Sequence, residues 1–473
     1  MVVELKNAVI SFSYFSCREK KAPETFLNAS KYYLSMVKPD NSVMKCLVLR
    51  LQTTTQDKEL LDDLRLAYRE AYNQYLAIGK ELKTANYKEL ERTSIQHRLL
   101  ENTRQCARDI ACEAIRSYYE LRKENDSTEF PHITDKPMSA RMNFRDGYTI
   151  SKHLIARISI RKGVQVRVPI TGSPEQLLLI HQTVNKTYRL GAAIVKKYRG
   201  EYYLHVNIEL GKKPVYVAQP QQTFIGIDVN EKNLALSALT PDGTLLGSLV
   251  LDYTDLNGVK QRFFTTRKRL QKNHNLALVK TIRNKEHNTV MDVYHKVTHM
   301  AMLWMECFPN PILILEDLTY IREQIKMGKR MNRRLHRWAF GELQRQLTYK
   351  AHYRNWFVQT VNPEYTSQTC PVCTKARRSH KNKRRFQCKT KTCHFTDHRD
   401  RVASVNIALK GIALLLNQPN VLTLKKHQFG SHSLKVVRRL ASGLLKSVEE
   451  CLTEFQDFLG TRTVRWQKRL QTS

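Results

Sequence analysis

The chain has 473 residues, 79 of them Lys or Arg and 43 Asp or Glu, which gives a formal net charge of +36. Such an excess is typical of a protein that neutralises phosphates, and we favour this interpretation over charge that only aids solubility. The size of the chain argues against a ribosomal or membrane-surface role. With 41% hydrophobic residues the chain can build real cores, and its length predicts about two to four domains. No apolar run reaches the roughly 18 residues of a membrane span, so we expect no transmembrane helix. The first residues lack the features of a secretory leader, so we do not expect secretion.

The amino-terminal half predicts a β-rich unit interrupted by helices. Residues 1–43 are weakly patterned and are taken as an extension. Residues 44–56 begin with a strand, MKCLVLRL, and residues 57–125 carry apolar side chains at helical spacing. Within residues 126–211, three segments alternate apolar and polar side chains: 155–160, 164–170 and 204–210. Together with the early strand they predict a small antiparallel barrel interrupted by a helical insertion. Residues 212–222, with two prolines, are predicted to be a linker.

The carboxyl-terminal half predicts a mixed α/β sheet. In residues 223–365 the order is strand, strand, strand, helix, strand, helix, strand, which is typical of a ribonuclease H-type fold. A basic loop is expected at 326–337. Residues 366–395 contain a cysteine cluster, and residues 396–411 return to the sheet as a helix. The last segment, 412–473, has a helical pattern and is predicted to be a helical extension.

Four of the ten cysteines lie within 24 residues, in a C-x2-C and a C-x4-C pair: Cys370, Cys373, Cys388 and Cys393. Two close pairs joined by a loop supply the four tetrahedral thiolates that Zn²⁺ prefers. His394 and His398 flank the last cysteine and could replace a thiolate, although four cysteines suffice. The remaining cysteines are scattered, which predicts buried thiols in a reducing compartment and no disulfide framework.

Three acidic residues stand where an apolar segment ends or begins. Asp228 ends the strand FIGID, Glu316 ends the strand ILILE, and Asp400 opens an apolar helix. A carboxylate in such a place is costly unless it faces solvent or a cation. Three convergent carboxylates can hold two Mg²⁺ ions about 4 Å apart and hydrolyse a phosphodiester. Asp317, beside Glu316, should point away because side chains alternate along a strand.

These residues resemble the TnpB proteins, transposon-encoded RNA-guided nucleases with a RuvC-like domain, which are related to compact type V CRISPR effectors and to the eukaryotic Fanzor proteins. The similarity runs through GIDVN (226–230), LEDL (315–318), NPEYTSQTCPVC (362–373) and HRDRVASVNIA (398–408), and covers most of residues 222–411. Asp400 is preferred to Asp397 because D-R-V-A-S-V-N-I aligns with the family's D-x-N-A-A-x-N-I. Val402 departs from the common Asn, and C-x4-C departs from the commoner C-x2-C.

The resemblance implies a function for each part. Asp228, Glu316 and Asp400 would be the catalytic acids that bind Mg²⁺, and the cysteines would bind a structural Zn²⁺ in a ribbon that contacts target nucleic acid. The barrel would be a wedge domain and the helices a recognition domain. The partners would be a guide RNA and a double-stranded DNA target beside a short flanking motif. We expect a monomer in a prokaryotic cytoplasm, associated with the nucleoid, or in the nucleus if the protein is a Fanzor.

Basic residues of the two amino-terminal parts are candidate nucleic-acid contacts. The helical part would read the flanking motif and grip the heteroduplex through Arg65, Arg69, Arg104, Arg116 and Arg122. The β part would hold the RNA scaffold through Arg157, Arg161, Lys162 and Arg167. The basic residues of the cysteine region would either contact a nucleic-acid backbone or form a solvated loop.

Other functions remain open. A compact CRISPR effector or a Fanzor protein would use the same chemistry, and genomic context would separate them. An RNA-guided repressor that does not cleave usually lacks one of the acids, and here all three are present. A transposase could use the same acids, but a zinc ribbon before the third acid fits the guided nucleases better.

Overall fold

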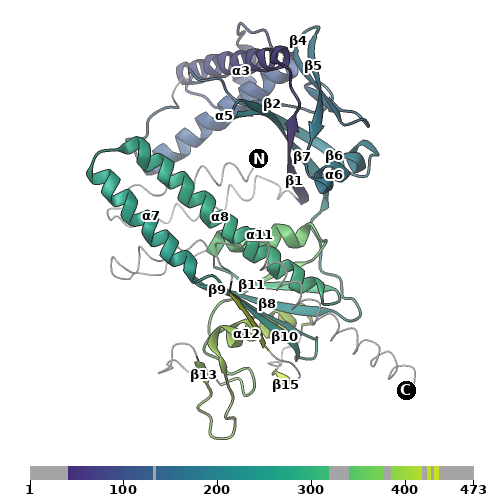
Figure 1. Ribbon diagram of the computed structural model, residues 1–473, viewed down its shortest axis with the longest axis vertical. Helices are drawn as coiled ribbons and strands as arrows, with labels where there is room; N and C mark the ends of the chain where they lie inside the picture. The colour runs from purple at the N-terminus through teal and green to yellow at the C-terminus, as the bar shows by residue number, and fades with distance from the viewer. Residues whose placement is uncertain are drawn as a thin grey trace. The chain divides into compact units, whose positions relative to one another are not determined.

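The structure is a computed structural model that describes residues 41–131, 135–318, 340–375, 385–417, 423–427 and 431–435. Most of the predicted extension 1–43, the basic loop 326–337 and everything after residue 435 lie outside these residues. The described elements form two α/β groups, one before and one after the linker 212–222 (Figure 1). None of the described helices is long and apolar enough to cross a membrane.

The first group is built on a seven-stranded sheet in the order β2-β6-β7-β1-β5-β4-β3. The early strand β1 lies between β7 and β5, so it joins the later strands as the sequence predicted. The edge strands β2 and β3 are consecutive in the chain, which brings the two ends of the sheet close together; closure into a barrel stays a prediction. The strands are β1 (Ser42–Leu51), β2 (Ala140–Met142), β3 (Tyr148–Ile150), β4 (Ile155–Arg161), β5 (Val164–Thr171), β6 (Arg189–Tyr198) and β7 (Glu201–Lys212).

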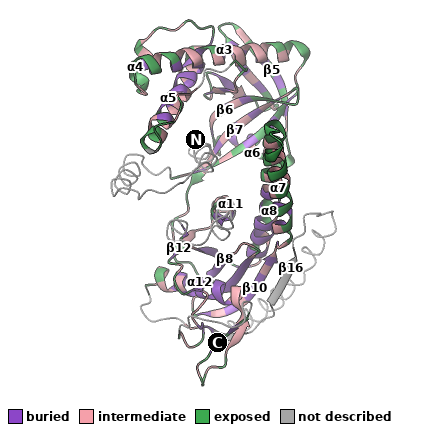
Figure 2. Cartoon of the chain, turned by 90° about the vertical axis from the view of Figure 1, so that its left-hand side faces the viewer, coloured by how far each residue is buried: buried purple, intermediate pink, exposed green. Residues whose placement is uncertain are grey.

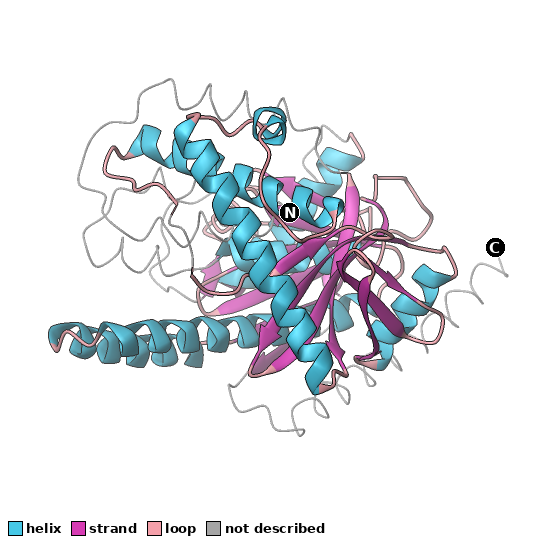
Figure 3. Cartoon of the chain, turned by 90° about the horizontal axis from the view of Figure 1, so that it is seen from above, coloured by secondary structure: helices cyan, strands magenta, loops and turns pink. Residues whose placement is uncertain are grey.

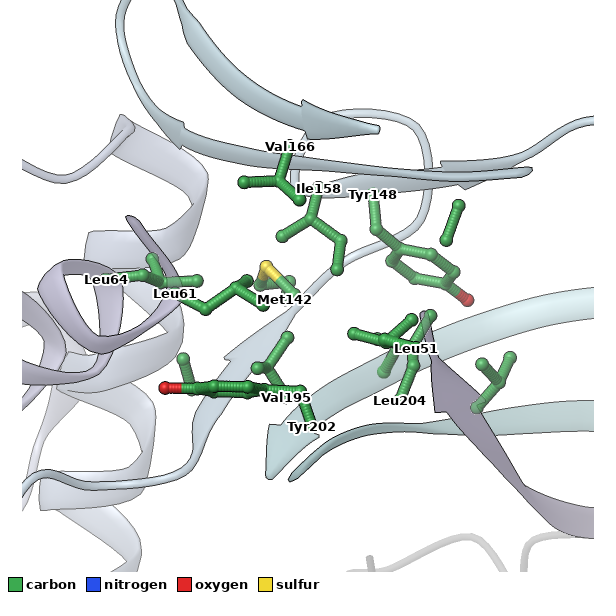
Figure 4. Packing of buried hydrophobic residues seen from close by; sticks show 14 of the residues in the cluster. Leu51, Leu61, Leu64, Met142, Tyr148, Ile158, Val166, Val195, Tyr202 and Leu204 are labelled. Atoms are coloured by element: carbon green, nitrogen blue, oxygen red, sulfur yellow. The ribbon is translucent and has the colours of Figure 1, made fainter. Parts of the chain in front are cut away.

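Helices α3 (Thr55–Glu81), α4 (Tyr87–Arg92) and α5 (Glu101–Glu124) are the helical insertion. A capping box between Thr54 and Asp57 fixes the start of α3, two residues before the predicted start. Leu61 and Leu64 of α3 pack among side chains of the sheet (Figure 4). Strands β2, β3 and β6 and helix α6 (Pro174–Val184) were not predicted, although Ser173, Pro174 and Gln176 make a capping box that marks the start of α6.

The second group is a mixed sheet in the order β12-β11-β8-β9-β10-β15, with β16 also paired to β10. β8 is parallel to β11 and antiparallel to β9, and β11 is parallel to β12. The strands follow the predicted order, but the structure has one more helix before the first predicted one. The strands are β8 (Thr223–Val229), β9 (Asn233–Leu239), β10 (Thr244–Asp252), β11 (Pro311–Glu316), β12 (Val358–Val361), β15 (Lys425–His427) and β16 (Ser431–Lys435).

Helices cover both faces of this sheet (Figures 1 and 2). On one face, Ile225 and Leu313 pack with α8 (Leu276–Glu306) and α11 (Phe340–His352). On the other face, Phe224 and Ile314 pack with α12 (Arg399–Leu415). Helix α7 (Asp255–Lys272) runs beside α8 (Figure 3). It is the additional helix, and it was not predicted because its segment is rich in basic residues and few apolar side chains mark a face there.

Two glycines let α12 lie close to the sheet. A Cβ atom at Gly226 of β8 would overlap the backbone of Ser404 and Ala408 in α12. A Cβ atom at Gly411 of α12 would lie only 2.5 Å from Cγ1 of Ile314 in β11. Since neither glycine has a positive φ, both are required by space and not by backbone conformation. The close approach fixes the depth at which the first turn of α12 meets the end of β8.

The predicted boundary at residue 411 and the helical character of the segment after it are partly wrong. Helix α12 continues to Leu415, and the next described residues form the strands β15 and β16, both parallel to β10. These strands have three and five residues, too short for a clear alternation in the sequence. They form because the edge of β10 offers unpaired backbone groups, which is a tertiary effect.

Candidate metal centres

The three predicted acids lie where three elements meet at one edge of the mixed sheet. The β8–β11 ladder pairs Ile227 with Leu315, so the next residues along these parallel strands are Asp228 and Glu316. Asp400 is the second residue of α12, which packs against β8. The same face of the sheet carries Phe224, four residues before Asp228, and Ile314, two residues before Glu316, so both acids point toward the α12 side.

Asp228 is the most buried of the three acids, with 8% of its surface exposed. The Asn230 side-chain amide donates a 2.7 Å hydrogen bond to its Oδ2. Burial raises the pKa of Asp228 well above its usual value, the charges of Glu316 and Asp400 raise it further, and Asn230 opposes the shift. A bound divalent cation would reverse this balance, because it favours the ionised carboxylate.

Asp400 is held from the start of β9. The Asn233 side-chain amide donates a 2.7 Å hydrogen bond to Asp400 Oδ2, and Asn230 Nδ2 lies 3.2 Å from Asn233 Oδ1. The turn that carries both asparagines is fixed by the buried Tyr253, whose hydroxyl donates to the Asn230 carbonyl at 2.5 Å and approaches the Asn233 carbonyl at 3.1 Å. The two asparagines therefore connect Asp228 to Asp400.

Glu316 is held by the loop before the cysteine cluster. The Thr366 hydroxyl donates a 2.6 Å hydrogen bond to Glu316 Oε1, and Gln344 of α11 donates to the Glu316 backbone carbonyl at 2.8 Å. Burial raises the pKa of Glu316, while Thr366 and the nearby charge of Lys410 lower it. The raised pKa values of Asp228 and Glu316 have one main cause, which is that both carboxylates are removed from water.

Asp397 and Asp317, the neighbouring acids that were not predicted to belong to the site, lie in environments different from those of the three candidate acids. Asp397 forms an ion pair with Arg401 one turn along α12 and accepts the His398 backbone amide at 2.5 Å. Asp317 is exposed, as alternation along the strand predicts. Within the part of the chain that the structure describes, Asp228, Glu316 and Asp400 do not form a cluster as tight as that of the cysteines.

The four predicted cysteines come together as one site. Their sulfur atoms all lie within 4.8 Å of one another, with Cys370 Sγ 3.7 Å from Cys393 Sγ and Cys373 Sγ 3.5 Å from Cys388 Sγ. Four thiolates about 2.3 Å from a tetrahedral Zn²⁺ would be about 3.8 Å apart, so the residues fit this metal. Burial opposes ionisation of Cys373, but the Lys375 backbone and neighbouring Thr390 and cysteine side chains lower its pKa to about 6. His394 and His398 are not members of the cluster among the described residues.

The cysteine site is attached to α12 by a small apolar cluster of its own. Strands β13 (Arg385–Gln387) and β14 (Thr396–His398) form a two-stranded sheet beside it. Val402 of α12 is 1% exposed and packs with Phe386 and Cys370. The departure from Asn at this position therefore has a physical role, because Val402 joins the helix that carries Asp400 to the cysteine site.

The predicted nucleic-acid contacts divide by burial. Arg104 is 7% exposed and its guanidinium is paired with Glu91, Glu101 and the Tyr75 hydroxyl, so it supports the helices and does not face a ligand. Arg65 pairs with Asp62 and donates to a backbone carbonyl, and Arg69 also donates to a backbone carbonyl. The remaining candidates on these elements are exposed or half-buried: Arg116, Arg122, Arg157, Arg161, Lys162 and Arg167.

Four residues beside the acids were not predicted as site residues: Asn230, Asn233, Tyr253 and Thr366. Asn230 and Thr366 lie within the motifs GIDVN and NPEYTSQTCPVC, and this position in a motif could have identified them as site residues. No sequence signal marked Asn233 or Tyr253, because their roles depend on the pairing of β8 with β9 and of β9 with β10.

The family model of the Cas12f1-like TNB domain matches residues 340–407. A TnpB-like protein of Methanocaldococcus jannaschii is 29% identical over 252 residues, which cover 52% of this chain and 86% of that protein. The CRISPR-associated endodeoxyribonuclease Cas12f1 of Sulfoacidibacillus thermotolerans is 32% identical over 99 residues, or 21% of this chain and 22% of that protein.

Among solved structures, the mini-RNA-guided endonuclease CRISPR-Cas phi3 aligns with a TM-score of 0.50 and 10% sequence identity, covering 87% of this chain and 99% of that chain. This likeness concerns the fold, which is a multidomain α/β architecture. The matched proteins form one class, the TnpB-like proteins and the compact Cas12 endonucleases. The chain is similar to the TnpB-like proteins over about half of its length.

Proposed function

We propose that this protein is a transposon-encoded, RNA-guided DNA endonuclease with a RuvC-like domain. The observation that supports it most is the meeting of Asp228, Glu316 and Asp400 at one sheet edge, where the charges of the last two raise the pKa of the first. Groups that repel one another in this way are the usual ligands of a divalent cation. The substrate would be double-stranded DNA beside a short flanking motif, selected by pairing with the guide RNA.

Two bound Mg²⁺ ions would supply an activated water and stabilise the leaving oxygen of the phosphodiester. The chain's own residues prepare this site. Asn230 and Asn233 orient the carboxylates of Asp228 and Asp400, and Thr366 orients that of Glu316. Burial of Asp228 and Glu316 excludes bulk water and raises their pKa values, whereas a bound cation would favour the ionised carboxylates and strengthen its own contacts in the dry site.

The other parts would have the roles of their family counterparts. Residues 44–56 and 126–211 would form the wedge domain, and 57–125 the recognition domain. Residues 223–365 and 396–411 would form the nuclease domain, and 366–395 a zinc ribbon that binds target nucleic acid. A net charge of +36 supports extensive phosphate contact.

The first experiment is to isolate the protein from its host, sequence the bound RNA, and test the complex on a plasmid library with Mg²⁺. We expect a discrete RNA from beside the gene, and cleavage that the Asp228→Ala variant loses by at least 10³-fold. Specific binding without cleavage by the wild type would favour a repressor. The absence of bound RNA would overturn the guided mechanism and leave a transposase.

A compact CRISPR effector is the second candidate, favoured by the match of residues 340–407 to the Cas12f1-like family model. The same experiment separates the two, because the bound RNA would then map to a repeat array. A Fanzor protein would instead come from a eukaryotic gene with introns.

A further inference from the structure

The loop between β12 and the cysteine site contacts the end of β11. Thr366 is 5% exposed, and its hydroxyl donates to Glu316 Oε1 at 2.6 Å and lies 3.1 Å from the Pro363 carbonyl oxygen. Neither Thr366 nor its loop belongs to the sheet, so the position of this hydroxyl depends on whatever holds the loop.

Helix α12 holds this loop from one side. The Asn406 side-chain amide is 6% exposed and donates to the carbonyl oxygens of Thr366 at 2.7 Å and Thr369 at 2.8 Å. One turn further along the helix, Lys410 Nζ donates to the carbonyls of Asn362 and Glu364. The loop is thus fixed at both ends by hydrogen bonds to one face of α12.

The cysteine site holds the loop from the other side. Thr369 directly precedes Cys370, which is fully buried and packs with Phe386 and with Val402 of α12. The Thr369 amide donates to the Tyr365 carbonyl at 2.9 Å, so the backbone between Thr366 and Cys370 is a tight turn. A metal ion on the four thiolates would therefore fix Cys370, the turn, and through it Thr366.

We propose that Thr366 is a positioning residue that couples the zinc ribbon to the acidic site by orienting the carboxylate of Glu316. The inference rests on the proposed function and deepens it: the ribbon contributes to divalent-cation binding at the acids as well as to contact with nucleic acid. Loss of zinc loosens the turn, frees the Thr366 hydroxyl and leaves the Glu316 carboxylate without its hydrogen bond.

The test uses a pair of substitutions that differ only in the hydroxyl. Thr366→Val keeps the shape and removes the donor, whereas Thr366→Ser keeps the donor. Mn²⁺ binding to the full-length protein without nucleic acid is measured by electron paramagnetic resonance, with zinc content measured in parallel. We expect Thr366→Val to weaken Mn²⁺ binding by about 10-fold, as the loss of one hydrogen bond to a charged group implies. Thr366→Ser should restore most of it, with zinc content unchanged in both.

The matched control is Thr360→Val, the same change on the exposed side of β12, which should leave Mn²⁺ binding unchanged. Coupling to the ribbon is tested with Cys373→Ser, which should reduce zinc content and weaken Mn²⁺ binding. In the double variant with Thr366→Val the two losses should not add, because both act through one hydrogen bond.

Equal Mn²⁺ affinity in Thr366→Val and the wild type overturns the inference, as do fully additive losses in the double variant. These outcomes are distinct from failure of the proposed function. If the wild type does not cleave DNA with any guide, the function fails, but the Mn²⁺ measurements still report on Thr366. If the wild type cleaves and Thr366→Val lowers kcat without changing DNA binding, both stand.

Discussion

Uncharged side chains determine how the charged ones are presented in this protein. Asn230, Asn233 and Thr366 each donate one hydrogen bond to one of the three acids, at 2.6 to 2.7 Å. Asn233 and Thr366 are distant in the chain from the acids that they contact. Asn230 is the exception, because it lies two residues after Asp228. The geometry of the acids is thus set by the β8–β9 turn and the loop before the ribbon.

The arginines of the helical insertion differ in how far they are buried and in the partners that they contact. Arg104 is buried with Glu91 and Glu101, whereas Arg116 is exposed and donates only to the Ala85 carbonyl, at 3.3 Å, among the contacts described. We predict that Arg104→Ala lowers the free energy of unfolding by about 1–3 kcal/mol, because a buried tyrosine and carboxylates lose a partner. Arg116→Ala should change it by less than about 0.5 kcal/mol.

Thermal unfolding measures the change in stability of both variants. The salt dependence of RNA binding tests separately which arginine contacts RNA. If Arg116 contacts a phosphate, its removal lowers the slope of log K against log salt by about 1, and removal of Arg104 does not. A smaller slope in Arg104→Ala with unchanged stability would contradict this division.

At the scale of elements, the contact between α12 and the sheet determines where Asp400 lies. Ser404 Oγ is 2.7 Å from Ser237 Oγ of β9, which is 3.1 Å from Ser248 Oγ of β10, so a buried hydroxyl chain links the helix to two strands. Apolar packing through Ile407 and Ile412 covers the rest of this face. The helix has little room to shift, since Gly226 and Gly411 already bring the backbones together.

We predict that Gly226→Ala destabilises the protein by about 1–3 kcal/mol or more and abolishes DNA cleavage, because the added methyl group displaces α12 and with it Asp400. The control is Gly258→Ala in α7, where a Cβ atom meets nothing within 4 Å. That change should be neutral or stabilise by up to about 1 kcal/mol through helix propensity. Unfolding and cleavage assays on both variants test this prediction. A fully active Gly226→Ala variant would show that the added methyl group does not displace α12.

The acids could be selected as candidates, and the cysteine cluster predicted, because each is marked by local context: an apolar run that ends in Asp228 or Glu316, and the short cysteine spacings. Strands with clear alternation and helices with a clear apolar face were predicted for the same reason. What could not be predicted depends on partners distant in the chain. β16 exists because of β10, α7 because of α8, and the role of Asn233 because α12 lies across β9.

At the scale of the whole molecule, the basic charge is present in both described groups. We predict that RNA affinity falls about 10³- to 10⁵-fold between 50 and 200 mM salt if about 6–10 phosphates are neutralised. Filter binding at a series of KCl concentrations measures this slope. The Asp228→Ala variant should show the same slope, since the acids would bind cations and not RNA. A nearly flat dependence would mean that the charge serves a purpose other than phosphate contact.

The pairing of β15 and β16 with β10 determines how the protein can be divided. β10 carries a row of apolar residues, and its outer backbone groups are satisfied only by residues 425–427 and 431–435 among the described strands. A fragment that stops after α12 would keep all three acids and all four cysteines but would leave this edge open. An open, apolar edge strand is a template for intermolecular pairing, so such a fragment would aggregate. Any minimal version of the carboxyl-terminal half should therefore extend at least to Lys435.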